Sequence, residues 1–375
     1  MNSYDIKKKR VLIVVPYITA FGGLERLLID LTGYLSDNNI KYNLVCYECT
    51  IDLSGYAKRF VDVVVLPKQK DPFLRLIELQ KFLDKSKEEQ LGKILVVGLQ
   101  AALHAFFIGL TNYAVLIIDP PSLFSPPVGS NSNLLMKIRS VISNIFIKRS
   151  LNKASWSSVM TEYIKSEIKA LYGVNPIIDR PGIEVSNKKF IVRKYSQSKP
   201  FRILSVSRIE KSKRLDIILD SLGTITNNPK YSLFKRKWIF DVAGTGADLN
   251  RIKNMVIERG WQGKVFFHGH VNEQELADLF KRAHLFVIPA RQGYGLPALE
   301  SLTQGIPVLL HRESGVSEVL AGTPWVEVVN DEEFTAGLEK MINRVIDGTL
   351  AKKGMPNIPN SEKWAEAICK RNDWI

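Results

Sequence analysis

Short apolar runs alternate with segments of helical periodicity along nearly the whole chain, and this alternation restricts the fold more than any other feature. The runs cover residues 11–16, 43–47, 61–66, 94–97, 115–118, 156–160, 201–205, 238–243, 265–268, 284–290 and 308–310. Such runs, rich in β-branched residues, are typical of strands buried in a parallel sheet. Helical segments such as 24–36, 72–90 and 101–110 separate several of them, which is the pattern of a doubly wound α/β sheet.

The chain is long enough for two domains of this kind. It has 375 residues, of which 45% are hydrophobic. The pattern restarts after residues 186–199, a polar, basic stretch without clear periodicity that has the composition of a linker. We therefore expect one Rossmann-like domain over residues 1–185 and a second over residues 200–360.

Cysteine usage and hydropathy favour a cytoplasmic protein. The chain has three cysteines, too few for a disulfide framework. Cys46 and Cys49 would point to opposite faces of a strand, so we expect them to pack rather than to bind a metal or react. We find no apolar run of roughly 18 residues and no signal-peptide pattern at the basic N-terminus.

Residues 289–310 predict the end of a strand, a glycine loop, a helix and another strand. The two glycines of the loop allow the backbone to approach a ligand closely, and the helix that follows adds partial positive charge. Phosphates and sugar hydroxyls bind at such a junction. The glycines also fit a turn that merely packs, so this alternative stays open. The candidate ligand-binding residues here are Gln292, Gly293, Tyr294, Gly295, Leu296 and Glu300.

Glycine turns recur after other expected strands. Gly22 and Gly23 follow the first strand, where a tight βα turn is the alternative to a ligand-binding loop. Gly244 and Gly246 follow the strand at 238–243. Because parallel sheets bind ligands beyond the carboxyl ends of their strands, all four glycines are placed where a ligand is expected.

Two basic residues and one acidic residue stand at further strand ends. Arg208 and Lys213 lie in a basic loop that leads into a helix, and a guanidinium and an ammonium at this place suit a ligand with concentrated negative charge. The alternative is a solvated basic turn. Asp119 ends another strand before two prolines, where a turn or capping role competes with a functional one.

These motifs, in this order, resemble those of the retaining GT-B glycosyltransferases of family 4. That family has two glutamates eight positions apart around a G-F/Y-G-L-P segment; here the second is Glu300, and the first position holds Gln292. Residues 207–216 resemble the family's G-R-x-x-x-x-K-G-x-D segment, and residues 22–26 resemble its N-terminal G-G-x-E-R loop. The resemblance extends over roughly residues 9–375.

The resemblance implies a GT-B fold, in which two Rossmann-like domains face a central cleft and a C-terminal helix, here 361–375, crosses back to the first domain. It implies a nucleotide-diphosphate sugar held mainly by the second domain and a glycan or lipid-linked acceptor held by the first. Transfer would proceed with retention, and the leaving phosphate would take the acceptor's proton. No metal or other cofactor is implied.

The resemblance also implies residue roles. Glu300 would bind ribose hydroxyls, Arg208 and Lys213 the diphosphate, and the turn at Val271 the base. Asp119 takes the approximate place of a family histidine near the transferred sugar. The implied catalytic residues are Asp119, Arg208, Lys213 and Gln292. The implied donor-binding residues are Gly22, Gly23, Arg208, Lys213, Gly244, Gly246, Val271, Gln292, Gly293, Tyr294, Gly295, Leu296 and Glu300.

The first half of the chain is strongly basic. The whole chain has a net charge of +14, and no acidic residue occurs between residues 120 and 161. Residues 134–153 combine helically spaced apolar residues with lysines and arginines, which predicts a helix that lies on an anionic membrane, at the inner face of a cytoplasmic membrane. The alternative is a helix packed on its own sheet.

Several functions are excluded or kept as alternatives. The five histidines lack metal-ligand spacing, and no basic motif with interleaved aromatic residues favours nucleic acid. Gln292 and the missing histidine leave two alternatives to a transferase. One is a non-catalytic paralogue that acts as partner of an active transferase, and the other is a GT-B nucleotide-sugar epimerase.

Overall fold

The computed structural model describes residues 9–57, 59–123, 134–184, 195–233, 236–290, 294–354 and 356–375, without the side chains at 123, 134–140 and 351–352. The chain forms two compact units. The first unit comprises Met1–Gly182 and Pro359–Ile375, and the second comprises Ile183–Ile358.

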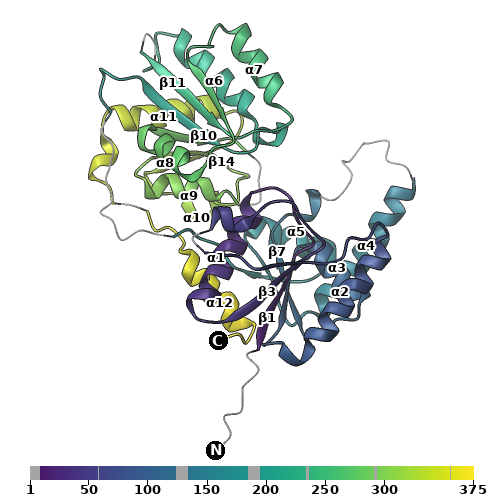
Figure 1. Cartoon of the computed structure of the whole chain (residues 1–375). Coiled ribbons are helices and arrows are strands. Elements are labelled where there is room, and N and C mark those ends of the chain that lie inside the picture. Colours follow the sequence, from purple (N-terminus) through teal and green to yellow (C-terminus); the bar gives the residue numbers. More distant parts are fainter. Residues whose placement is uncertain are drawn as a thin grey trace, which may run out of the picture. The chain divides into compact units, whose positions relative to one another are not determined.

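The first unit contains a seven-stranded parallel sheet in the order β5-β3-β1-β6-β7-β8-β9 (Figure 1). Its strands are β1 (Arg10–Val14), β3 (Lys41–Cys46), β5 (Val63–Val65), β6 (Ile94–Val97), β7 (Tyr113–Ile117), β8 (Ser157–Val159) and β9 (Ile177–Ile178). From β1 the chain winds through β3 to β5, and from β6 it winds the other way, so the winding reverses between β1 and β6. Two short parallel strands, β2 (Tyr17–Ile18) and β4 (Glu48–Cys49), extend beyond β1 and β3.

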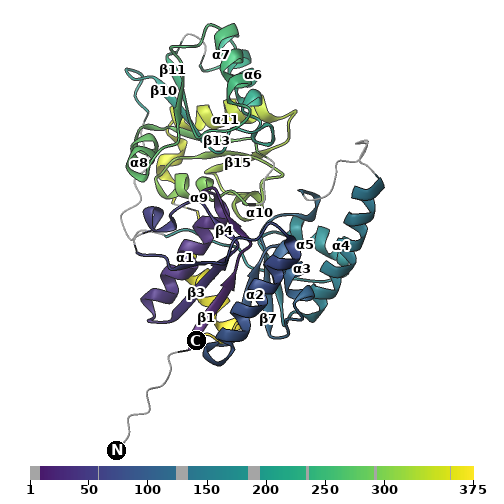
Figure 2. The same ribbon diagram turned by 45° about the vertical axis from the view of Figure 1, so that its right-hand side comes forward.

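Helices cover both faces of this sheet. They are α1 (Gly23–Asp37), α2 (Pro72–Ser86), α3 (Leu99–Phe107), α4 (Leu134–Lys153), α5 (Glu162–Tyr172) and α12 (Ser361–Arg371), with 3-10 turns η1 (Leu53–Tyr56), η2 (Lys87–Glu89) and η3 (Pro121–Leu123). Figures 1 and 2 show α1 beside α12 on one face and α2 to α5 on the other. Asp71 and Thr161 cap α2 and α5 by accepting bonds from backbone N–H groups of the first turn.

The C-terminal helix α12 is anchored to this unit by buried polar contacts. Arg371 pairs with the buried carboxylate of Asp179, and its backbone carbonyl accepts hydrogen bonds from Trp156 Nε1 (3.1 Å) and Lys93 Nζ (3.1 Å). Removing one partner of a buried, hydrogen-bonded ion pair is strongly destabilising, so these contacts hold α12 in place.

The second unit contains a six-stranded parallel sheet in the order β12-β11-β10-β13-β14-β15. Its strands are β10 (Phe201–Val206), β11 (Trp238–Ala243), β12 (Val265–Gly269), β13 (Leu285–Ile288), β14 (Val308–His311) and β15 (Val326–Val329). Its helices are α6 (Leu215–Asn227), α7 (Leu249–Glu258), α8 (Glu273–Arg282), α9 (Leu296–Thr303), α10 (Ser317–Leu320) and α11 (Phe334–Ile346), with 3-10 turns η4 (Lys211–Lys213) and η5 (Thr349–Lys352). One core joins α6, α7 and α11 to the sheet, and Figure 2 shows α8 on the opposite side of β10.

The structure confirms the predicted fold class. Each unit is a doubly wound parallel sheet, and a strand occurs at every apolar run named above. The sequence did not predict the extension β2-β4, strands β9 and β15, or helices α7, α10 and α11. Residues 186–194 of the expected linker 186–199 lie outside the described residues.

Candidate active site

Backbone hydrogen bonds join the turns at the carboxyl ends of β10, β11 and β12. Ser207 donates its N–H to the carbonyl of Ala243 (3.1 Å), and Ile209 donates to Thr245 (2.8 Å). Gly244 donates to the carbonyl of Gly269 (2.7 Å). The loop that carries Arg208 is therefore fixed to the glycine turn beside it.

The glycines of that turn are required by the chain's own backbone. A Cβ added at Gly244, where φ is +132°, would lie 1.9 Å from the carbonyl oxygen of Ser207. One at Gly246 would lie 2.3 Å from the carbonyl oxygen of Ile209. The sequence predicted a ligand-facing turn here, and the structure adds that both glycines lie against the backbone of the loop 207–209.

Arg208 and Lys213 both belong to this fixed loop. The Arg208 side chain is 63% exposed, and its Nη1 lies 3.1 Å from Glu210 Oε1. An exposed ion pair of this kind contributes little to stability, so the guanidinium is able to exchange Glu210 for a phosphate. Lys213 is half-buried at the end of η4, and its N–H donates to the carbonyl of Glu210 (2.9 Å).

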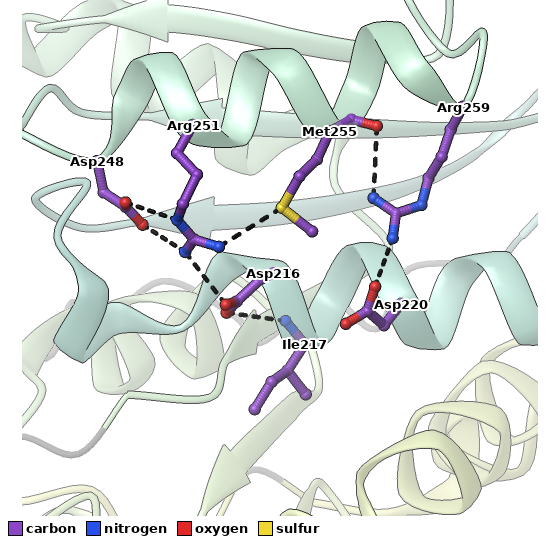
Figure 3. Close-up of polar contacts among 7 residues, drawn as sticks. All are labelled: Asp216, Ile217, Asp220, Asp248, Arg251, Met255 and Arg259. Carbon is purple, nitrogen blue, oxygen red and sulfur yellow. Dashed lines mark hydrogen bonds and ion pairs between the residues drawn. The ribbon is translucent and has the colours of Figure 1, made fainter.

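An arginine on α7 fixes the helix that follows Lys213. Figure 3 shows Arg251 bound to Asp248 through Nη2 (2.6 Å) and Nε (2.7 Å), and to Asp216 through Nη2 (3.1 Å). The hydrogen bond from Arg251 is the main reason that the pKa of Asp248 lies below its usual value, and the same bond raises the pKa of Arg251. The network joins the start of α6, after Lys213, to the start of α7, after Gly246.

Arg214 occupies an unusual backbone position that the sequence did not reveal. It has φ +55° and ψ +41°, a left-handed conformation that disfavours any residue with a Cβ, and the resembling family has glycine here. Its Nη1 lies 2.5 Å from Asp331 Oδ1, and the same oxygen lies 3.0 Å from His311 Nε2. These contacts tie the Lys213 loop to the end of β14.

Helix α9 begins at the neighbouring strand end. Gly295 precedes it with φ +110° and supplies no side-chain cap, so the first-turn amides of α9 have no side-chain acceptor at this cap. The carbonyl of Tyr294 accepts bonds from Val316 N–H (2.9 Å) and Ser314 Oγ (3.2 Å), which hold the loop against the segment after β14. Glu300 lies half-buried on α9.

The second unit thus gathers most of the predicted donor-binding residues at one sheet edge. The turns after β12, β11, β10 and β13 are neighbours in the strand order, and they carry Val271, Gly244, Gly246, Arg208, Tyr294, Gly295 and Leu296. Gln292 and Gly293 lie outside the described residues.

The remaining predicted residues belong to the first unit. Gly22 and Gly23 start α1 after β1, and a Cβ added at Gly23 would meet no heavy atom within 4 Å among the described residues. Asp119 is exposed after β7. Because β6 separates β1 from β7, these two positions lie two strands apart, about 10 Å across the sheet.

Helix α4 packs differently from the single apolar face predicted for it. Ile147 and Leu151 are buried against the sheet, whereas Val141, Ile142 and Ile145 are 59%, 47% and 48% exposed. The exposed cations of this helix that the structure describes, Lys148, Arg149 and Lys153, contact no carboxylate among the described residues. No helix in the described part of the chain has the length and hydropathy to span a membrane.

The described residues contain no grouped metal ligands, and two of the cysteines are buried. In this part of the chain, no three histidine, cysteine, aspartate or glutamate side chains are grouped as metal ligands. Burial raises the pKa of the Cys46 and Cys369 thiols to about 12, so both are protonated, packed side chains near neutral pH.

Comparison with known proteins finds a family similarity in the second unit. The family model described as glycosyl transferases group 1 matches residues 187–348, which include the edge with Arg208, Lys213 and Glu300. Over these residues the chain is similar to the glycosyl transferases group 1 family. One relative, alpha-monoglucosyldiacylglycerol synthase of Streptococcus pneumoniae, is 28% identical over 194 residues, which cover 50% of this chain and 40% of that protein.

Solved structures of glycosyltransferases share the whole fold. WaaG, a glycosyltransferase involved in lipopolysaccharide biosynthesis, aligns over 97% of this chain and 95% of its own, with a TM-score of 0.67 and 18% identity. HepE of Anabaena in complex with UDP-glucose aligns over 97% and 95%, with a TM-score of 0.68 and 16% identity. These alignments confirm the predicted GT-B fold. Sequence matches cover less than half the length of the curated relatives.

Proposed function

We propose that this chain transfers a sugar from a nucleotide-diphosphate donor to a hydroxyl group of a glycan or lipid-linked acceptor, with retention of anomeric configuration. The observation that supports the proposal most directly is the arrangement of residues at the carboxyl edge of the second sheet. There a fixed loop bearing Arg208 and Lys213 stands beside an α9 N-terminus with no side-chain cap. The family match to this unit and the UDP-glucose complex of HepE support a nucleotide-sugar ligand.

The basic loop would stabilise the leaving diphosphate. Negative charge grows on the diphosphate as the sugar bond breaks, and a guanidinium and an ammonium already in position stabilise that charge without further reorganisation. The hydrogen bonds through Ser207 and Ile209, together with the Arg214–Asp331 pair, restrict the movement of Arg208 and Lys213. Glu300 would accept hydrogen bonds from the ribose hydroxyls.

Retention would follow from attack on the face that the diphosphate leaves. The leaving phosphate oxygen would take the proton from the acceptor hydroxyl, so that the reaction needs no separate base. Gln292 would accept a hydrogen bond from a sugar hydroxyl, since glutamine keeps an acceptor oxygen but lacks the charge of glutamate. Asp119 would contact the acceptor that the first unit holds.

The acceptor would be reached at an anionic membrane surface through α4. The exposed Val141, Ile142 and Ile145 are followed on the helix by Lys148 and Arg149, the order of apolar and cationic groups that favours binding in the lipid interface. The relative named alpha-monoglucosyldiacylglycerol synthase makes, by its name, a glucosylated diacylglycerol, which supports a lipid acceptor.

A thermal-shift panel with UDP, GDP, ADP, CMP and their sugar conjugates tests the donor proposal. A ligand at a hundred times its Kd adds about 2.7 kcal/mol of stability, which raises the Tm by several degrees. We expect one nucleoside diphosphate and its sugar conjugates to stabilise the chain selectively. A flat panel would instead favour the non-catalytic paralogue. With the donor known, an α-linked product from an α-linked donor would establish retention, and free sugar with nucleotide would indicate an epimerase.

Vesicle sedimentation tests the membrane proposal. The protein should sediment with vesicles containing phosphatidylglycerol, and less so at high salt. The double variant Lys148→Glu/Arg149→Glu should weaken binding about 30-fold or more, because each cation near the surface contributes about 1 kcal/mol. The matched reversal Lys81→Glu/Lys85→Glu on α2 should bind like the wild type. If the α4 double variant binds vesicles as tightly as the wild type does, α4 is not the membrane-binding surface.

A further inference from the structure

A polar cluster that no motif predicted lies at the carboxyl edge of the first sheet. Arg75 donates through Nη1 to the hydroxyl of Tyr17 (2.8 Å) and through Nε to the carbonyl of Gln69 (2.7 Å). The hydroxyl of Tyr47 lies 3.1 Å from His104 Nδ1, and the rings of Tyr17 and Tyr47 are 6.2 Å apart. We name Tyr17, Tyr47, Arg75 and His104 the Arg75 cluster.

The Arg75 cluster lies where a doubly wound sheet binds its ligands. Tyr17 and Tyr47 follow the ends of β1 and β3, and His104 lies on α3, which begins directly after β6. These three strands are neighbours, and the winding of the sheet reverses between β1 and β6. Ligands bind outside the strand ends at such a reversal point.

The charge of the cluster is not balanced by the protein. Among the residues that the structure describes, no carboxylate forms an ion pair with Arg75, and its Nη2 has no protein acceptor. Arg75 is half-buried, and a guanidinium withdrawn from water normally has an anionic partner.

The other members of the cluster can supply hydrogen-bond donors. Tyr17 accepts the bond from Arg75 with its oxygen, so its own O–H proton remains available to a ligand. Burial, and next to it the charge of Arg75, lowers the pKa of His104 to about 4, so the ring is neutral near pH 7. If Tyr47 donates to Nδ1, the Nε2–H of His104 is a second donor.

We propose that the Arg75 cluster binds a phosphate group of the acceptor. An arginine fork with a tyrosine hydroxyl and an imidazole N–H provides the cation and the donors that a tetrahedral oxyanion needs, and no base to compete with it. The assignment of this phosphate to the acceptor rests on the proposed function, since the donor's diphosphate belongs to the second unit.

The test follows the ring signals of His104 in the full-length protein. The chain has five histidines, so the His104 signal is assigned by its loss in His104→Gln. Inorganic phosphate should shift this signal saturably in the wild type. The apparent Kd should rise at least tenfold in Arg75→Gln and about threefold to tenfold in Tyr17→Phe, which removes one hydroxyl from a partly exposed side chain. Lys81→Gln, an equal change of charge on the same helix, should bind like the wild type.

The absence of a saturable shift in the wild type would overturn the proposal, and so would an unchanged Kd in Arg75→Gln and Tyr17→Phe. Because donor binding is measured in the second unit, these results are independent of the nucleotide panel. Lys213→Ala should leave the response of His104 to phosphate unchanged. A second titration then compares glucose 6-phosphate with dihexanoyl-phosphatidylglycerol below its micelle concentration: tighter binding of one assigns the phosphate to a sugar or to a lipid.

Discussion

The carboxyl edges of the two sheets use glycine for different purposes. In the second unit Gly244 lies against the backbone of Ser207, which leaves no space for a side chain. In the first unit Gly23 starts α1. A Cβ added there would meet no heavy atom of the described residues within 4 Å. The same strand–glycine–helix pattern therefore serves internal packing at one edge and leaves open space at the other.

The cations at the two edges differ as well. Arg208 and Arg214 have carboxylate partners in Glu210 and Asp331, and the loop that holds them is hydrogen-bonded to its neighbours. Arg75 has no such partner among the described residues. This difference suggests a rigid edge prepared for a diphosphate in the second unit and an edge with unbalanced positive charge in the first.

The largest expected effect is that of Gly244→Ala. The added methyl group would overlap the Ser207 carbonyl, which belongs to a loop held by the backbone N–H groups of Ser207 and Ile209, and the residue would have to keep φ +132°. We therefore expect a loss of more than about 4 kcal/mol in unfolding free energy. Chemical denaturation measures it. Gly263→Ala, where the added Cβ meets nothing within 4 Å, should change stability by less than about 0.5 kcal/mol. A stable Gly244→Ala protein would show that the turn is not packed as described.

Lys213→Ala should retain the fold and lower kcat by about 10²–10³, equivalent to about 2.7–4 kcal/mol of transition-state stabilisation. The physical reason is the loss of an ammonium that stabilises the leaving diphosphate. Initial rates of transfer at saturating donor measure it. Lys211→Ala, which removes an exposed lysine from the same η4 turn, should lower kcat less than threefold. If both variants lower kcat equally, Lys213 has no specific role in stabilising the leaving diphosphate.

His104 should make the first unit sensitive to acid. Its pKa is lowered from 6.5 to about 4 in the folded chain, so the unfolded chain binds more protons between these values. The free energy of unfolding should therefore fall by about 3 kcal/mol as the pH decreases from 6.5 to 4. In His104→Gln this part of the pH dependence should be absent, which denaturation curves recorded at several pH values across this range will measure. His270→Gln, which removes an exposed histidine, should keep the wild-type slope, and an unchanged slope in His104→Gln would contradict the shift.

Gly23→Ala, at the carboxyl edge of the first sheet, should lower activity without lowering stability. The fold should be unchanged or stabilised by less than about 1 kcal/mol, because alanine fits an early helical position better than glycine does. The methyl group would, however, fill space that the proposed ligand needs, so kcat/KM should fall about tenfold, or 1.4 kcal/mol. If Gly23→Ala keeps full activity, Gly23 has no role in ligand binding.

The smallest effect is expected for Gln292→Glu. If the side chain only accepts a hydrogen bond from a sugar hydroxyl, either residue serves, and transfer rates should stay within about tenfold, or 1.4 kcal/mol. Complete loss of transfer would contradict this hydrogen-bonding role.

The sequence predicts the strands well because buried parallel strands are continuous apolar runs, as at Ile94–Val97. It also places Arg208 and Lys213 at a strand end, since both follow such a run directly. It could not reveal the contact between Tyr47 and His104, which are 57 positions apart and meet only through the packing of α3 on the sheet. Nor could it show that Arg214 adopts a left-handed conformation, because the stabilising carboxylate comes from Asp331.

Titration calorimetry with UDP, GDP and ADP tests the central claim most directly. The account predicts that one of these diphosphates binds the wild type and Lys211→Ala with the same Kd, and that Lys213→Ala raises this Kd at least tenfold, or 1.4 kcal/mol. The same diphosphate should bind Arg75→Gln as tightly as it binds the wild type. If no diphosphate binds, or if Lys213→Ala binds as tightly as the wild type, the edge of the second sheet is not the donor site.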